Sequence, residues 1–149
     1  MFQLYSKGCE YTIKALIQMK DSTQNYGAKD ICRRARVPES FSRKIFQSLV
    51  RGKFLQAVPG PGGGYKLCKR PNEISILDVI QAVDGPSAFD QCIMSLSKCS
   101  EKHACLLHQS WLKVKEPLLH ELQNKKLQDL MKNHNGNALK RLEKIHRGD

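Results

Sequence analysis

The 149-residue sequence predicts a mainly α-helical fold with one small β-hairpin. Apolar residues recur at steps of three and four over most of the chain, which is the period of an amphipathic helix. A single cluster of glycine and proline, residues 59–64, lies between two short stretches with strand character. A later apolar stripe, again with helical spacing, covers residues 107–122 and predicts a long C-terminal helix.

Three helices are predicted before the hairpin. The first covers about residues 6–20, and the second covers 28–36 with three small or aliphatic residues facing inward: Ile31, Cys32 and Ala35. The third follows Pro38, which suits a first helical turn, and ends at Gly52, which suits a cap. We expect its buried stripe to consist of Phe41, Ile45 and Leu49.

The hairpin is predicted from residues 54–58 and 65–67, which flank the run Pro-Gly-Pro-Gly-Gly-Gly. Two short helices with a tight turn, followed by such a hairpin, are the arrangement of a winged helix-turn-helix. Ser75 and Asp78 then have the spacing of a capping box, and their helix should stop before Gly85.

The long C-terminal helix should begin near Lys102 and be kinked or broken at Pro117. Its stripe is too long for one small domain to bury, so we expect it to pair with a second copy of the chain. The stripe consists of Leu107, Trp111, Val114, Leu118 and Leu122, and a last short helix should contain Leu127, Leu130 and Met131.

Four regions follow from these elements. They are a winged helix-turn-helix domain over 1–85, a cysteine-rich cluster-binding loop over 86–106, a dimerisation helix region over 107–131, and a basic flexible tail over 132–149.

The net charge of +11 is concentrated in one part of the chain. Residues 28–70 hold eleven Lys and Arg against two acidic residues, a net +9. Such a local excess is typical of a protein that binds a polyanion, here double-stranded DNA. No stretch of about 18 apolar residues and no secretory leader are present, so we expect a cytoplasmic protein without a membrane span. No catalytic triad, carboxylate pair or phosphate loop indicates an enzyme.

The third helix and the hairpin supply the candidate DNA contacts. With its apolar stripe turned inward, that helix presents Ser40, Arg43, Lys44 and Gln47 on the open side. Arginine suits guanine edges and glutamine suits adenine, whereas serine and lysine mostly contact phosphates. In the hairpin, the candidates are Gly60, Gly62, Gly63 and Tyr65, because a turn with few side chains brings its backbone close to DNA. The alternative is a surface hairpin that touches nothing.

Three of the six cysteines form a cluster with the spacing C-x6-C-x5-C: Cys92, Cys99 and Cys105. His108 follows three residues later, on the same helical face as Cys105. Thiolates, with histidine as an accepted substitute, are ligands of iron–sulfur clusters. A zinc site or a thiol switch without a metal are alternatives. The remaining three, Cys9, Cys32 and Cys68, are interpreted mainly as packing residues.

Several motifs together resemble one bacterial regulator family, the family that contains IscR, NsrR, RirA and CymR. The similarity covers about residues 4–123 and rests on Glu10-Tyr11, the run from Gly60 to Tyr65, the stretch Ile76-Leu77-Asp78-Val79-Ile80-Gln81-Ala82-Val83-Asp84-Gly85, and the cysteine cluster. One difference is Pro59, which occupies the place of an arginine that many members direct into the minor groove.

The resemblance implies a homodimer that binds operator DNA, mostly as a repressor, through Ser40, Arg43 and Lys44. It also implies an iron–sulfur cluster that senses cluster status, redox state or nitric oxide. His108 would complete a [2Fe–2S] site, which we favour, whereas Glu10 of the partner subunit would complete a [4Fe–4S] site. The alternative is a regulator of the same fold without a cluster, controlled by cysteine oxidation or by a protein partner.

Overall fold

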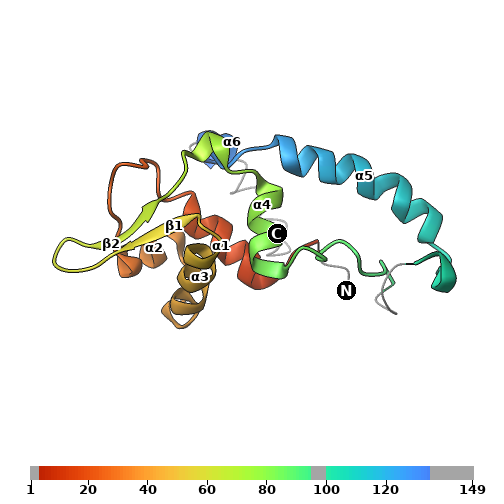
Figure 1. Cartoon of the computed structure of the whole chain (residues 1–149), viewed down its shortest axis with the longest axis horizontal. Coiled ribbons are helices and arrows are strands. Elements are labelled where there is room, and N and C mark those ends of the chain that lie inside the picture. Colours follow the sequence, from red (N-terminus) through yellow and green to blue (C-terminus); the bar gives the residue numbers. More distant parts are fainter. Residues whose placement is uncertain (1–3, 95–99, 135–149) are drawn as a thin grey trace, which may run out of the picture.

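The computed structural model describes residues 4–94 and 100–134. In Figure 1 the first helices and the hairpin are gathered into one body, another helix lies at its side, and a long helix runs away from it. In chain order the elements are α1 (Lys7–Leu16), α2 (Ala28–Ala35), α3 (Glu39–Arg51), β1 (Leu55–Val58), β2 (Gly64–Leu67), the 3-10 turn η1 (Pro71–Glu73), α4 (Ile76–Asp84), the 3-10 turn η2 (Glu101–His103), α5 (His108–Asn124) and α6 (Leu127–His134).

The core of the winged body takes buried side chains from helices α1 to α3, from both strands, and from α4 and α6. The inward positions predicted for α2 are confirmed, because Ile31, Cys32 and Ala35 are all buried. For α3 the prediction is wrong at one position. Its buried residues are Ile45, Phe46 and Leu49, while Phe41 is 43% exposed. Phe41 belongs to a first turn whose other residues are almost all exposed, and its ring packs edge-to-face with Tyr11 at 5.2 Å between ring centres.

The hairpin is anchored to the body by its second strand. β1 and β2 pair antiparallel, from Leu55 opposite Leu67 to Val58 opposite Gly64. Tyr65 also exchanges two backbone hydrogen bonds of 2.8 Å with Tyr26, and its ring stacks on Phe46 at 4.5 Å between centres. The base of the wing is therefore held by both backbone pairing and core packing.

Helix α4 begins as predicted, with a capping box in which Ser75 and Asp78 each accept the other's backbone N–H at 3.0 Å. It ends at Asp84, whose carboxylate accepts the backbone N–H of Ser6 at 2.7 Å and also the Ser6 hydroxyl. Ser6 in turn caps α1 by accepting the Cys9 N–H at 3.1 Å. The end of α4 is thus tied to the start of α1.

Helix α5 begins later than predicted, at His108 rather than near Lys102. The turn η2 lies in between, and the extended ψ of 122° at Ala104 prevents that turn from continuing into the helix. Pro117 does not break α5, which is continuous to Asn124.

Helix α6 confirms the last predicted helix and returns to the winged body. Leu127 is fully buried, and its N–H donates to the Ile74 carbonyl at 2.8 Å. Among the described residues, no helix is both long and apolar enough for a transmembrane segment.

Candidate functional site

The exposed face of α3 carries the residues predicted to contact DNA. Ser40, Arg43, Lys44 and Gln47 are all exposed, while the opposite face of the helix is buried in the core. Within residues 4–94 and 100–134, neither Arg43 nor Lys44 forms an ion pair. Their charges are consequently available to an external anion.

The turn between α2 and α3 fixes how this face is presented. Arg36 caps α2 in the left-handed conformation (φ 54°), and the Val37 N–H donates back to the Cys32 carbonyl at 2.9 Å. This tight turn is typical of a helix-turn-helix, in which the second helix enters the major groove. On α2 itself two of the three cations share one carboxylate, since Asp30 pairs with Arg33 at 2.6 Å and with Arg34 at 2.8 Å.

A hollow of about 350 Å³ lies where α3 meets the wing. Its lining includes Gln47 and Arg51 from α3 and Ala57 and Tyr65 from the strands. Arg51 is not among the DNA-contact candidates predicted from the sequence. The signal was present in the spacing, because Arg43, Gln47 and Arg51 follow one another at steps of four and so share one helical face.

The glycines of the wing turn have different roles. A side chain at Gly63 would place its Cβ 2.1 Å from the Val58 carbonyl oxygen, so the turn itself requires glycine there. Gly60 and Gly62 adopt φ of 90° and 71° with open space around them. Tyr65 is half-buried and stacks on Phe46, so it has a structural role in the wing besides any contact with DNA.

The cysteine segment is only partly described, because Cys99 lies in 95–99, outside the described residues. Cys92 is buried, Cys105 is half-buried, and His108 is 4% exposed at the first position of α5. The His108 N–H donates to the Cys105 carbonyl at 3.0 Å, so the two residues share one turn of chain. The described residues contain no group of three metal-binding side chains. The complete ligand set stays a prediction.

Glu10, the other candidate fourth ligand, is already paired. Its carboxylate lies 2.7 Å from Lys7 Nζ and 2.8 Å from Lys14 Nζ. Burial alone would raise the pKa of Glu10, but the hydrogen bonds from the two lysines outweigh it and the pKa is lowered. In the single chain this carboxylate is held on α1.

The cysteines of the winged body behave as predicted for packing residues in two of three cases. Burial, with a smaller contribution from Asp84, raises the pKa of Cys9 to about 12. Burial also raises the pKa of Cys32, with Glu39 adding to the effect and a hydrogen bond with Ser42 opposing it. Cys68 differs because it is exposed after β2.

The start of α5 exposes an apolar patch, which we define as Leu106, Leu107, Leu112 and Val114. Leu106 is 96% and Val114 58% exposed. Of the predicted stripe, Trp111 is buried and Leu118 and Leu122 are half-buried. Leu119 and Leu122 pack on the cluster around α4, whereas Lys115 pairs with Asp90 at 3.0 Å. One chain therefore partly covers the leucines in the second half of α5, whereas in the first half it buries Trp111 but leaves Leu112 and Val114 exposed.

A winged body with an uncompensated basic recognition helix defines the class of DNA-binding regulators. The chain matches the Rrf2 family, described as iron-dependent transcriptional regulators, over residues 5–133, and it belongs to this family. The resemblance inferred from the motifs is confirmed.

Individual relatives agree with this family assignment. The chain is 31% identical to the HTH-type transcriptional regulator IscR of Pectobacterium atrosepticum over 133 residues, which are 88% of this chain and 80% of that protein. Since the relatives are transcriptional regulators, the expectation that the chain is not an enzyme is also confirmed.

Two solved structures have the same fold. CymR, the global cysteine regulator of B. subtilis, has a TM-score of 0.73 at 19% identity, covering 89% of this chain and 98% of that one. IscR of T. potens has a TM-score of 0.66 at 21% identity, covering 87% and 86% of the two chains. These structures confirm the predicted winged-helix fold.

Proposed function

We propose that this transcriptional regulator is a homodimeric repressor that reads operator DNA with α3 and the wing under the control of an iron–sulfur cluster. The observation that carries the DNA-reading half is the exposed row of Arg43, Gln47 and Arg51 on α3, the last two of which line the hollow beside the wing. The neighbouring Lys44 and Ser40 contact phosphates, and the wing backbone at Gly60, Gly62 and Gly63 approaches the flanking strand.

Arg43→Ala tests this reading of DNA. If Arg43 contacts a base edge, the variant weakens binding to the operator by about 1–3 kcal/mol and relaxes specificity at that base pair. The operator is first selected from random duplexes with the wild-type protein, and affinity is then measured by fluorescence anisotropy at fixed salt.

Arg33→Ala is the matched control, because Arg33 carries the same charge but lies on α2 and pairs with Asp30. Arg33→Ala should change the affinity for operator DNA and the affinity for random DNA by the same factor. Unchanged operator affinity for Arg43→Ala would exclude a base-reading role for that residue.

The dimer is supported by the exposed apolar patch at the start of α5. A pair of α5 helices would bury Leu106 and Val114 and place two recognition helices about one DNA turn apart. Both Leu106 and the cysteine segment immediately precede α5, so the proposed sensor is continuous with the proposed dimer contact.

The cluster is supported by the donor set. Cys105 and His108 share one turn, Cys92 is buried, and the spacing to Cys99 is short enough for a common centre. Buried thiolate and imidazole ligands suit a [2Fe–2S] cluster, which would supply a redox- and ligand-sensitive centre when bound. We favour His108 over Glu10 as fourth ligand, because Glu10 would first have to give up two ion pairs.

The test is anaerobic purification followed by visible absorption and iron and sulfide analysis. Cys105→Ser should remove the colour and the iron, whereas Cys68→Ser, a change at an exposed cysteine of the wing, should keep both. His108→Ala and Glu10→Gln, made separately, then identify the fourth ligand. A colourless, iron-free wild-type protein with full operator affinity would instead support control by cysteine oxidation.

A further inference from the structure

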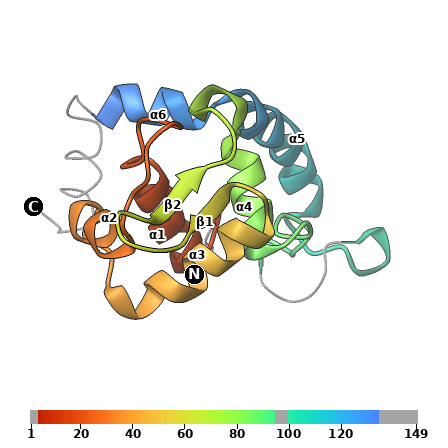
Figure 2. The ribbon, with the colours of Figure 1, turned by 60° about the vertical axis from the view of Figure 1, so that its left-hand side comes forward.

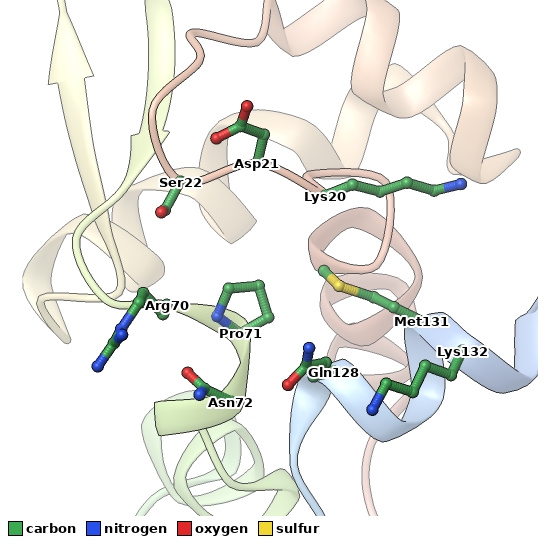
Figure 3. A pocket seen from close by; sticks show the side chains of 9 residues that line it. All are labelled: Lys20, Asp21, Ser22, Arg70, Pro71, Asn72, Gln128, Met131 and Lys132. Atoms are coloured by element: carbon green, nitrogen blue, oxygen red, sulfur yellow. The ribbon is translucent and has the colours of Figure 1, made fainter.

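A second hollow lies on the winged body, away from α3. It has a volume of about 600 Å³ and lies between three segments that are distant in sequence: the loop after α1, the turn η1, and α6. Figure 3 shows side chains from all three segments around it. A volume of this size is within the range of small-molecule sites.

The lining is rich in hydrogen-bond donors. Six of the nine lining residues carry side-chain N–H or O–H groups: Lys20, Ser22, Arg70, Asn72, Gln128 and Lys132. Pro71 and Met131 contribute apolar surface between them, and Met131 is 8% exposed. In Figure 3 the three cationic side chains lie on different sides of the hollow.

The charges are poorly compensated. Within the described part of the chain, Lys20 and Lys132 form no ion pair, while Arg70 is paired with Glu73 at 3.2 Å. The one lining carboxylate, Asp21, accepts the backbone N–H and the hydroxyl of Thr23, each at 2.7 Å. The Asp21 carboxylate is therefore hydrogen-bonded within its own loop, and Lys20 and Lys132 are available to bind an external anion.

The hollow is separate from the DNA-reading face. Figures 1 and 2 both show α6 and α3 on opposite sides of the body, with the hairpin between them. The hollow nevertheless lies close to the base of the wing, because Arg70 follows shortly after β2. Helix α6 is joined to the segment that follows η1 by the hydrogen bond from the Leu127 N–H to the Ile74 carbonyl.

We propose that this hollow binds a small organic anion, a polycarboxylate or an organic phosphate with a short apolar portion. Its anionic groups would pair with Lys20 and Lys132 and accept from Gln128 and Ser22, and its apolar portion would lie on Met131 and Pro71. The bound anion would connect α6 to the base of the wing. This inference goes beyond the proposed function and does not depend on the cluster.

The test uses the full chain without DNA. The ¹⁵N-labelled protein is titrated with citrate, and separately with inorganic phosphate, while sodium chloride keeps the ionic strength constant. We expect saturable amide shifts confined to residues 20–22, to Arg70 and Asn72, and to residues 128–132, since Pro71 has no amide proton. The double variant Lys20→Gln/Lys132→Gln should weaken citrate binding at least about tenfold, as the loss of two charge-assisted contacts requires.

Lys29→Gln/Lys53→Gln is the control, since it removes two exposed lysines elsewhere on the basic body. It should leave citrate affinity within about twofold of the wild type, because only the lining lysines contact the anion. The proposal is overturned by shifts that do not saturate, by shifts centred on α3, or by equal weakening in both double variants. None of these outcomes affects the DNA-reading proposal, because Arg43→Ala is measured separately on DNA.

Discussion

The winged body and the start of α5 differ in how fully a single chain buries their apolar side chains. In the body, Phe46, Leu16 and Leu49 are at most 1% exposed, and the wing is fastened to the same core through Tyr65. At the start of α5, Trp111 is buried, but the four residues of the apolar patch, Leu106, Leu107, Leu112 and Val114, are between 39% and 96% exposed. Both regions are helical, so helix formation is not what separates them.

The difference indicates where each region obtains its stability. A helix is stabilised mainly by the apolar surface that it buries, and the body provides that surface within one chain. The start of α5 needs another surface, which a second copy would supply. The regulated part of this molecule is thus expected at the incomplete region, where a ligand or partner changes the balance more easily than in a packed core.

Phe46→Ala should have the largest effect on the body. Phe46 is 1% exposed and supports both α3 and Tyr65. Removing its ring should lower the free energy of unfolding by about 3–5 kcal/mol, since a large cavity remains. Phe41→Ala is the matched control, and because Phe41 is 43% exposed it should cost about 1 kcal/mol or less. Chemical denaturation measures both, and equal losses would mean that Phe41 is covered in the dimer.

Val114→Glu tests the incomplete region. Val114 is 58% exposed in one chain, so a glutamate there is well tolerated by a monomer. In a dimer it would bury an unpaired charge and should raise the dissociation constant roughly a hundredfold. Sedimentation at several concentrations measures this constant. Gln123→Glu adds the same charge at an exposed position in the other half of α5, and it should leave the association unchanged.

Local signals were enough to predict much of the winged body. The capping box at Ser75 and Asp78, the cap at Gly52 and the glycine-rich turn each rely on neighbours within a few residues, and all three lie where expected. The inward face of α2 was likewise predicted correctly from the spacing of Ile31, Cys32 and Ala35 alone.

The errors arise where the spacing of apolar residues does not determine the structure. Periodicity placed Phe41 with Ile45 and Leu49, but it could not show that the core ends before the first turn of α3. It likewise could not place the start of α5, which depends on the extended backbone at Ala104. The predicted cysteine site stays a prediction, because Cys99 lies outside the described residues and Glu10, the alternative to His108 as fourth ligand, would come from a partner subunit.

Cysteine reactivity in cluster-free protein also compares the winged body with the start of α5. Cys9 is fully buried in the body with a pKa of about 12, whereas Cys105 before α5 is half-buried. Iodoacetamide at pH 8–10 should therefore modify Cys105 at least about a hundredfold faster than Cys9, which reacts only through opening of the body. Peptide mass mapping distinguishes the two sites, and comparable rates would show that the body opens as readily as α5.

The raised pKa of Cys9 also predicts how stability changes in alkali. From about pH 8.5, the usual thiol value, up to about 12, Cys9 ionises in the unfolded chain but stays protonated in the folded one. The unfolded state therefore binds fewer protons, and the free energy of unfolding falls as the pH rises through this window. Cys9→Ala removes this contribution, so denaturant unfolding of the variant should show a shallower decline from pH 8.5 to 10.5 than the wild type. Identical slopes would mean that the Cys9 thiol ionises as easily in the core as in water.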